Sequence, residues 1–139
     1  MPEAENQEAG SPASFFRMFI WMNGVLSDMK YDPSELIGKV IDLKSLADYQ
    51  EGSVVSRMVV NKKAGTVTAF AFEAGEGLSE HSAPFDALVI GLEGEAEIPI
   101  GGEPHIVKEG DMLIMPANVP HAVHPITRFK MLLVLIHAE

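Results

Sequence analysis

Histidine is the residue type in this sequence best suited to metal ligation or proton transfer. A neutral imidazole offers one nitrogen lone pair to a metal ion, and its ordinary pKa of about 6.5 lets it exchange protons near neutral pH. The chain contains no cysteine, which excludes disulfide bonds, thiol nucleophiles and zinc sites built from thiolates. It also lacks a glycine-rich phosphate loop, a Gly-x-Ser-x-Gly nucleophile motif and a His-Glu-x-x-His pair. The candidates are therefore the five histidines, His81, His105, His121, His124 and His137.

Two of these histidines follow segments that are typical of turns. His81 comes after the sequence AGEGLSE (residues 74–80) and precedes a strand-like run. His121 comes after PANVP (residues 116–120), where two prolines and an asparagine indicate a turn that leads into another strand. We therefore expect both side chains to lie where a strand meets a loop, and the other three histidines to lie at the surface or the rim.

The elements that must position these histidines read as short strands. From residue 39 onward, apolar runs alternate with turn signals at intervals of about eight to twelve residues, which is typical of a β-sandwich or barrel. In residues 95–100 (EAEIPI), Ala96, Ile98 and Ile100 fall on one face and the two glutamates on the other. This is the pattern of a sheet with one buried and one solvent-exposed face. The predicted strands include KVIDL (39–43), SVVSRMVV (53–60), TVTAFAFE (66–73), DALVIGLE (86–93), EAEIPI (95–100), HIVK (105–108), MLIM (112–115) and FKMLLVLI (129–136).

The first 38 residues have a different character, and we predict that they form a tail and a helical arm, with the β domain at residues 39–139. Residues 1–13 are polar and acidic, which predicts a disordered tail. Residues 15–23 (FFRMFIWMN) predict a short apolar helix that the domain core or a second subunit must cover. Pro33 followed by SELIG predicts a further helical turn that ends at Gly38.

Length and charge exclude several classes of function. The 139 residues, 15.1 kDa in mass, suit one domain, and 10 basic against 20 acidic residues give a formal charge of −10. Such a surface repels phosphate groups, so we expect neither nucleic acid nor membrane as a partner. The longest apolar stretch, residues 15–22, is shorter than a membrane span of about 20 residues and is preceded by acidic residues. We therefore expect a cytoplasmic protein.

The spacing of glycine, proline and histidine resembles the two motifs of the cupin superfamily across about residues 39–139. The first family motif is Gly, five residues, His-x-His, three or four residues, Glu, six residues, Gly. The second is Gly, five residues, Pro-x-Gly, two residues, His, three residues, Asn. The chain places Gly75, His81, Ala83, Ala87 and Gly94 at the positions of the first motif, and Gly110, Pro116, Asn118, His121 and Pro125 at those of the second.

The resemblance implies an all-β fold, a cupin-type double-stranded β-helix or jelly-roll barrel with a pocket inside, often assembled as a homodimer. Metal-binding cupins use two histidines and the glutamate of the first motif and the histidine of the second. Here His81 and His121 match, whereas Ala83 and Ala87 replace the other two ligands. Asp86 lies at an odd offset from His81 and becomes a third pocket residue if Pro84 introduces a bulge. Asn118 replaces a glycine and also tolerates a left-handed turn conformation.

Three hypotheses follow for the function. In the first, His81 and His121 hold a divalent metal ion (Fe, Mn, Ni or Zn), and the protein acts on a small organic molecule as an oxygenase, isomerase or lyase. In the second, the pocket binds or senses a small organic molecule without metal, and the two histidines act as hydrogen-bond partners. In the third, the barrel is a passive scaffold whose N-terminal arm swaps onto a partner subunit.

Overall fold

Nine antiparallel strands make up about half of the described part of the chain, which is residues 33–137 of a computed structural model. The predicted tail (1–13) and the predicted helix (15–23) lie outside the described residues. Two short 3-10 helices come first, η2 (Pro33–Glu35) and η3 (Leu43–Ser45). None of the helical segments within residues 33–137 has the length and hydropathy needed to cross a membrane. The strands are β1 (Val54–Lys62), β2 (Gly65–Phe72), β3 (Leu78–His81), β4 (Ala87–Glu93), β5 (Glu95–Glu97), β6 (Ile106–Lys108), β7 (Met112–Met115), β8 (His121–Pro125) and β9 (Phe129–Ile136).

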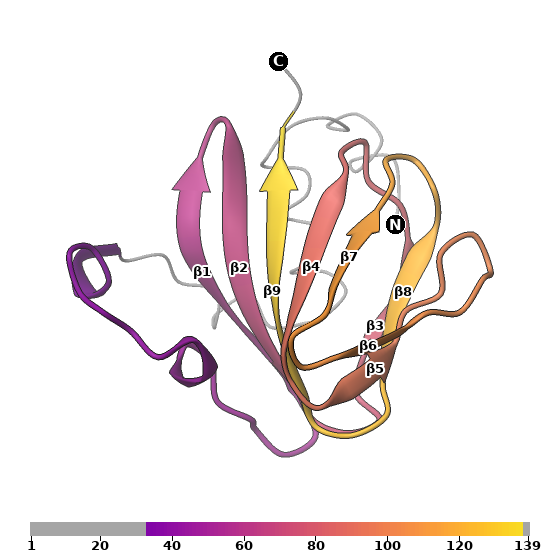
Figure 1. Ribbon diagram of the computed structural model, residues 1–139, viewed down its shortest axis with the longest axis horizontal. Coiled ribbons are helices and arrows are strands. Elements are labelled where there is room, and N and C mark those ends of the chain that lie inside the picture. Colours follow the sequence, from indigo (N-terminus) through magenta and orange to yellow (C-terminus); the bar gives the residue numbers. More distant parts are fainter. Residues whose placement is uncertain (1–32, 138–139) are drawn as a thin grey trace.

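The strands form two sheets that face each other. The larger sheet has the order β1-β2-β9-β4-β7, and the smaller has the order β3-β8-β5-β6. In Figure 1 the larger sheet spreads from β1 on the left to β7, and the smaller sheet lies on the right. All paired strands within the sheets are antiparallel. The prediction of an all-β sandwich or barrel is confirmed.

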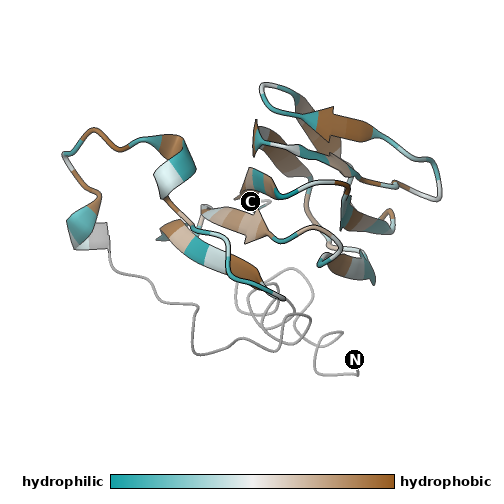
Figure 2. Ribbon diagram, turned by 90° about the horizontal axis from the view of Figure 1, so that it is seen from below, coloured by the Kyte–Doolittle hydropathy of each residue, from teal (hydrophilic) through white to brown (hydrophobic). Residues whose placement is uncertain are grey.

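The core between the two sheets is built from the inward-facing residues of all nine strands. Phe70, Phe72 and Phe129 are fully buried, and their rings stack in series with centroid separations of 5.6 and 6.0 Å. On and just after β5, Ala96 and Ile98 are fully buried. The neighbouring glutamates are partly exposed, as the alternation predicts. Figure 2 shows apolar residues concentrated in the strands and hydrophilic residues in the connecting loops.

The predicted strand at residues 39–43 (KVIDL) is not formed. Val40 is fully exposed, Ile41 packs on the outer face of the larger sheet, and Asp42 instead acts as the N-cap of η3 by accepting a hydrogen bond from the Lys44 amide. An aspartate side chain that satisfies a free helical amide favours a helical turn over a strand. A second difference concerns His81. The sequence indicates a strand that begins after this histidine, whereas in the structure β3 ends at it.

Residues 33–49 nevertheless lie against the β domain. The predicted helical turn is confirmed, since η2 begins at Pro33 and Gly38 has a φ of 77°. Leu36 and Ile41, from either side of the predicted boundary at residue 38, pack into one apolar cluster with residues of β1, β2 and β9. The Lys130 ammonium donates a hydrogen bond of 2.5 Å to the Lys44 carbonyl. This segment therefore covers part of the outer face of the larger sheet.

Candidate functional site

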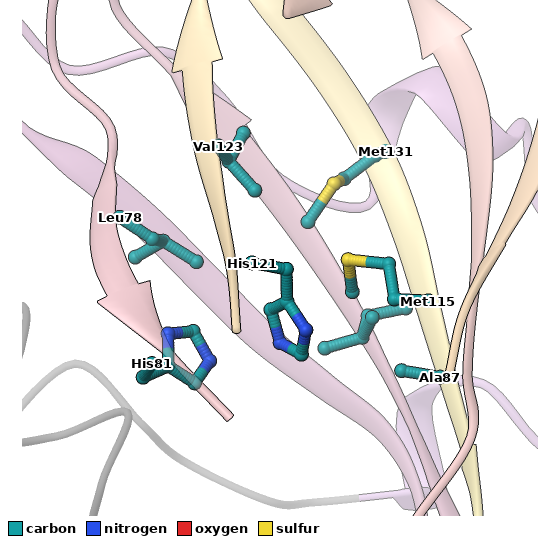
Figure 3. Close-up of a pocket in the computed structure, with 8 residues that line it drawn as sticks. Leu78, His81, Ala87, Met115, His121, Val123 and Met131 are labelled. Atoms are coloured by element: carbon teal, nitrogen blue, oxygen red, sulfur yellow. The ribbon is translucent and has the colours of Figure 1, made fainter. Parts of the chain in front are cut away.

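A small cavity between the two sheets contains the two histidines that the sequence singles out. Its volume is about 10 Å³, counted as space for the centre of a water molecule. This is room for about one water molecule or ion, and far less than the several hundred Å³ of a site for an organic molecule. Figure 3 shows the side chains around it. The lining comes from β3 (Leu78, His81), β8 (His121, Val123), β4 (Ala87), β7 (Met115) and β9 (Met131, Leu133).

The pairing register of the smaller sheet brings His81 and His121 together. The two residues are direct partners across the antiparallel pair of β3 and β8. Directly opposed residues on one face of a sheet have Cβ atoms about 5 Å apart, so their side chains are in contact. The two imidazole rings accordingly meet edge to face, with centroids 4.6 Å apart and an angle of 77° between their planes. His121 is 2% exposed and His81 is half-buried, so His81 is the solvent-side member of the pair.

Main-chain carbonyls fix the tautomer of both rings. Nδ1 of His81 lies 2.9 Å from the Ser79 carbonyl oxygen, and Nδ1 of His121 lies 3.1 Å from that of Val119. A carbonyl oxygen can only accept, so each Nδ1 carries the proton and donates it. In the neutral imidazoles the lone pair is therefore on Nε2. This is the arrangement in which a backbone acceptor orients a metal-ligating histidine.

Burial keeps His121 neutral. Its pKa is lowered from 6.5 to about 4, first because the low-dielectric interior disfavours the imidazolium and second because of repulsion from His81. The hydrogen bond to the Val119 carbonyl opposes this effect but does not outweigh it. At neutral pH the Nε2 lone pair of His121 is thus available without the loss of a proton.

The rest of the lining is apolar. Ala87 lies in the cavity wall, at the position where the family motif has glutamate. Ala83 is buried but does not line the cavity, because the chain between β3 and β4 is a loop rather than a continuous strand. The thioethers of Met115 and Met131 are the other side-chain heteroatoms in the lining. Within residues 33–137, no three His, Asp or Glu side chains are grouped as metal ligands.

Asp86 lies outside this cavity and instead supports the turn before His121. Its carboxylate accepts a hydrogen bond of 2.9 Å from the Ala117 amide. The next amide, that of Asn118, donates a hydrogen bond of 2.7 Å to the Ala83 carbonyl. These two bonds join the loop after His81 to the turn before His121. Asp86 therefore helps to position both histidine-bearing segments and is not among the residues that line the cavity.

The other three histidines are not among the residues that line the cavity. His124 follows His121 on β8, is exposed and faces the opposite side. His105 is half-buried, with Nδ1 3.3 Å from the Ile98 carbonyl oxygen. His137 packs against Phe85 at the far end of β9. No sequence signal pointed to Met115 and Met131 as cavity residues, because their place depends on how β7 and β9 face β3 and β8.

Asn118 has a φ of 66° and is the only non-glycine residue with positive φ among those described. A side chain with a Cβ costs about 1–2 kcal/mol in this conformation, and asparagine pays less than most. We predict that Asn118→Ala lowers the free energy of unfolding by about 1 kcal/mol, whereas Asn118→Gly changes it by under about 0.5 kcal/mol. Urea unfolding followed by circular dichroism measures both. Equal effects of the two variants would contradict a conformational origin.

Comparisons with known proteins find a matching family model and similar folds. A family model described as "Cupin domain" matches residues 69–137. A conserved protein of unknown function from Streptococcus pyogenes has a similar structure, with a TM-score of 0.70 and 37% identity over 73% of this chain and 90% of that one. A conserved-barrel cupin domain protein from Leptotrichia buccalis is 47% identical, with a TM-score of 0.62, over 64% of this chain and 43% of that one.

A cupin superfamily protein from Desulfitobacterium hafniense has a TM-score of 0.69 and 30% identity over 73% of this chain and 93% of that one. A search of curated proteins found no match. The motif positions, the two facing sheets and these matches agree, and the chain belongs to the cupin superfamily.

Proposed function

We propose that the chain is a metal-binding cupin in which Nε2 of His81 and Nε2 of His121 hold a divalent ion of Fe, Mn, Ni or Zn. The observation that carries this proposal is that both Nδ1 atoms are committed to main-chain carbonyls, at 2.9 and 3.1 Å. Two neighbouring rings thereby have their lone pairs on Nε2, beside a cavity with room for about one ion.

The donor set fits a metal ion with few protein ligands. Two imidazoles supply two nitrogen donors, and no carboxylate lines the cavity. Tight sites usually have three or four protein ligands, so water or a bound organic molecule would complete the coordination. When bound, such an ion polarises a carbonyl group, activates water or supports oxygen chemistry. The chain's own contribution is to orient the two imidazoles and to exclude bulk water from the side of His121.

The organic molecule would approach from the side of His81. The cavity is too small to enclose such a molecule. His81 is the partly exposed member of the pair, so a substrate group can reach the pair there. An oxygenase, isomerase or lyase reaction would then take place at the solvent side of the pair, with the buried His121 as the fixed ligand.

The apolar lining favours a second candidate, which is metal-free binding of a small organic molecule. Six of the eight lining residues are alanine, leucine, valine or methionine, and none carries a charge that would compensate a divalent cation. In this case the ligand would lie at the solvent side of the pair, where Nε2 of the partly exposed His81 would accept a hydrogen bond from it.

The experiment is elemental analysis of tag-free protein purified without chelators, together with titration by Zn²⁺ and Ni²⁺. We expect about one metal ion per chain in the parent and its loss in His81→Ala and His121→Ala. Loss of a supporting residue beyond the ligands weakens metal binding by about 10–100-fold, so loss of one of only two protein ligands should exceed that. His124→Ala is the matched control, because His124 lies on the same strand but on the opposite, exposed face.

Two outcomes would contradict a metal site at His81 and His121. Metal content that is unchanged in both histidine variants would place the ion elsewhere. A parent protein without metal, yet with thermal stabilisation by an organic ligand in the presence of chelator, would support the metal-free candidate.

A further inference from the structure

The larger sheet is apolar on its outer face as well as on its inner face. Near β1 and β2 the outer face is covered by residues 36–49, which pack on it through Leu36, Ile41 and Leu46. Toward β4 and β7 the same face carries Ile114 and Ile136, which are 51% and 66% exposed. A sheet that is apolar on both faces needs a cover on both. Among the described residues, that cover reaches only one side of the outer face.

The less covered side is hollowed. A hollow of about 600 Å³ lies over β4, β7 and the end of β9, about sixty times the volume of the cavity between the histidines. Its apolar floor comes from the outward-facing residues of those three strands, and its rim from the loop between β3 and β4. The lining residues are Pro84, Phe85, Asp86, Leu88, Ile114, Ala117, Val134, Ile136 and His137.

Two acceptors lie in this apolar surface. Nδ1 of His137 donates a hydrogen bond of 2.8 Å to the Lys63 carbonyl, so its Nε2 is an acceptor, and this Nε2 is buried without a hydrogen-bond partner among the described residues. A buried acceptor without a partner costs about 1–3 kcal/mol. The second acceptor is the carboxylate of Asp86, which is exposed. An occupant of the hollow should therefore bring apolar side chains together with N–H donors.

Residues 15–22 (FFRMFIWM) have this combination. Every residue in the segment is apolar except Arg17, and Trp21 adds an indole N–H. Arginine and tryptophan side chains are donors without acceptor capacity, and the guanidinium is also opposite in charge to Asp86. The segment offers two donors where the hollow offers two acceptors.

The path of the chain permits this placement. The described part begins at Pro33, and by Leu36 it already lies on the outer face of the same sheet. Five strands span about 19 Å at about 4.8 Å per step. The ten residues between Met22 and Pro33 can extend over roughly 33 Å. We propose that residues 15–22 dock in the hollow over β4, β7 and β9 of the same molecule and complete the cover of the outer face of the larger sheet.

The chain carries its own reporter, because Trp21 is its only tryptophan. In the full-length protein we expect emission at short wavelength and weak quenching by acrylamide, as for a buried indole. Ile114→Lys should shift the emission to longer wavelength and increase quenching several-fold. Ile126→Lys is the matched control, because Ile126 has the same 51% exposure as Ile114 but does not line the hollow, and it should change neither reading.

Ile136→Lys is a second variant at a more exposed lining position, and far-UV circular dichroism checks that each variant is folded. Parent emission typical of solvated tryptophan would overturn the proposal. Folded hollow variants whose emission matches that of the parent would also overturn it. Emission that shifts to longer wavelength on dilution, together with a fall in molar mass by light scattering, would show docking on a second copy and overturn docking within one molecule.

Discussion

Gly94→Ala is expected to lower the free energy of unfolding by about 3–5 kcal/mol, combining a conformational cost and a steric cost. Gly94 lies between β4 of the larger sheet and β5 of the smaller, where the chain passes from one sheet to the other. Its φ is +76°, and a Cβ built there would lie 1.7 Å from the Arg128 carbonyl oxygen and 2.8 Å from Thr127 Oγ1. The clashing atom is a backbone oxygen, which cannot rotate away as a side chain can. The backbone at Arg128, just before β9, therefore has to move.

Gly110→Ala separates the two costs. Gly110 has a φ of +91°, but a Cβ there would meet no heavy atom within 4 Å. This variant should lose only the conformational part, about 1–2 kcal/mol. Urea unfolding of both variants and the parent, with the slope of the transition compared, measures the difference. If the two glycine variants lose the same free energy, the close approach at Gly94 has no energetic consequence, and the requirement for glycine there is conformational only.

Metal-free protein is expected to lose about 3 kcal/mol of stability between pH 7 and pH 4 through His121 alone. The native pKa of this residue is about 4 because of burial and the nearby His81, against an ordinary value of 6.5. At pH 7 the residue is mostly neutral in the folded and unfolded states, so it favours neither. As the pH falls from about 6.5 to about 4, the unfolded chain binds a proton that the folded chain does not, and unfolding becomes favoured by about 1.4 kcal/mol per pH unit.

The test compares urea unfolding at pH 7 and pH 4 for the parent, His121→Gln and His124→Gln, all treated with chelator. The parent and His124→Gln should show the same fall in stability, because His124 is exposed. His121→Gln should show a fall smaller by about 3 kcal/mol. Carboxylates contribute to the pH dependence of all three proteins, so only the difference between variants is diagnostic. A fall of equal size in His121→Gln would mean that His121 is not held neutral in the folded state.

The same property bears on the metal proposal. A proton and a metal ion compete for the lone pair on Nε2 of His121. Because the folded protein leaves this nitrogen unprotonated down to about pH 4, its lone pair is unprotonated at neutral pH, as the proposed ligand role requires. If the metal proposal holds, metal binding and the loss of stability in acid would share one physical cause, which is the burial of His121 between the two sheets.

Much of the fold could be predicted from the sequence, because the relevant signals are local. Alternation in residues 95–98 fixed which side chains face the core, and the buried Ala96 and Ile98 confirm it. Turn chemistry was also readable, since Asn118 adopts the left-handed conformation for which it was singled out. The motif spacing identified the superfamily and the two histidines of the cavity. The alternation and the turn signals lie within a few residues of the features that they predict, whereas the motif spacing extends over residues 75–125.

Other features depend on contacts between segments distant in sequence, and only the tertiary structure decided them. The run KVIDL has the composition of a strand, but Asp42 caps a helical turn and the segment packs on a sheet instead. Asp86 has the chemistry of a ligand, but the loop between β3 and β4 directs it to the Ala117 amide. The sequence marked His81 and His121 as a pair, forty residues apart, but their ring contact, their tautomers and the low pKa of His121 follow from the register of β3 on β8 and from burial. The chemical type of a side chain is given by the sequence at one position. Its surroundings depend on how the strands pair and how the two sheets pack together.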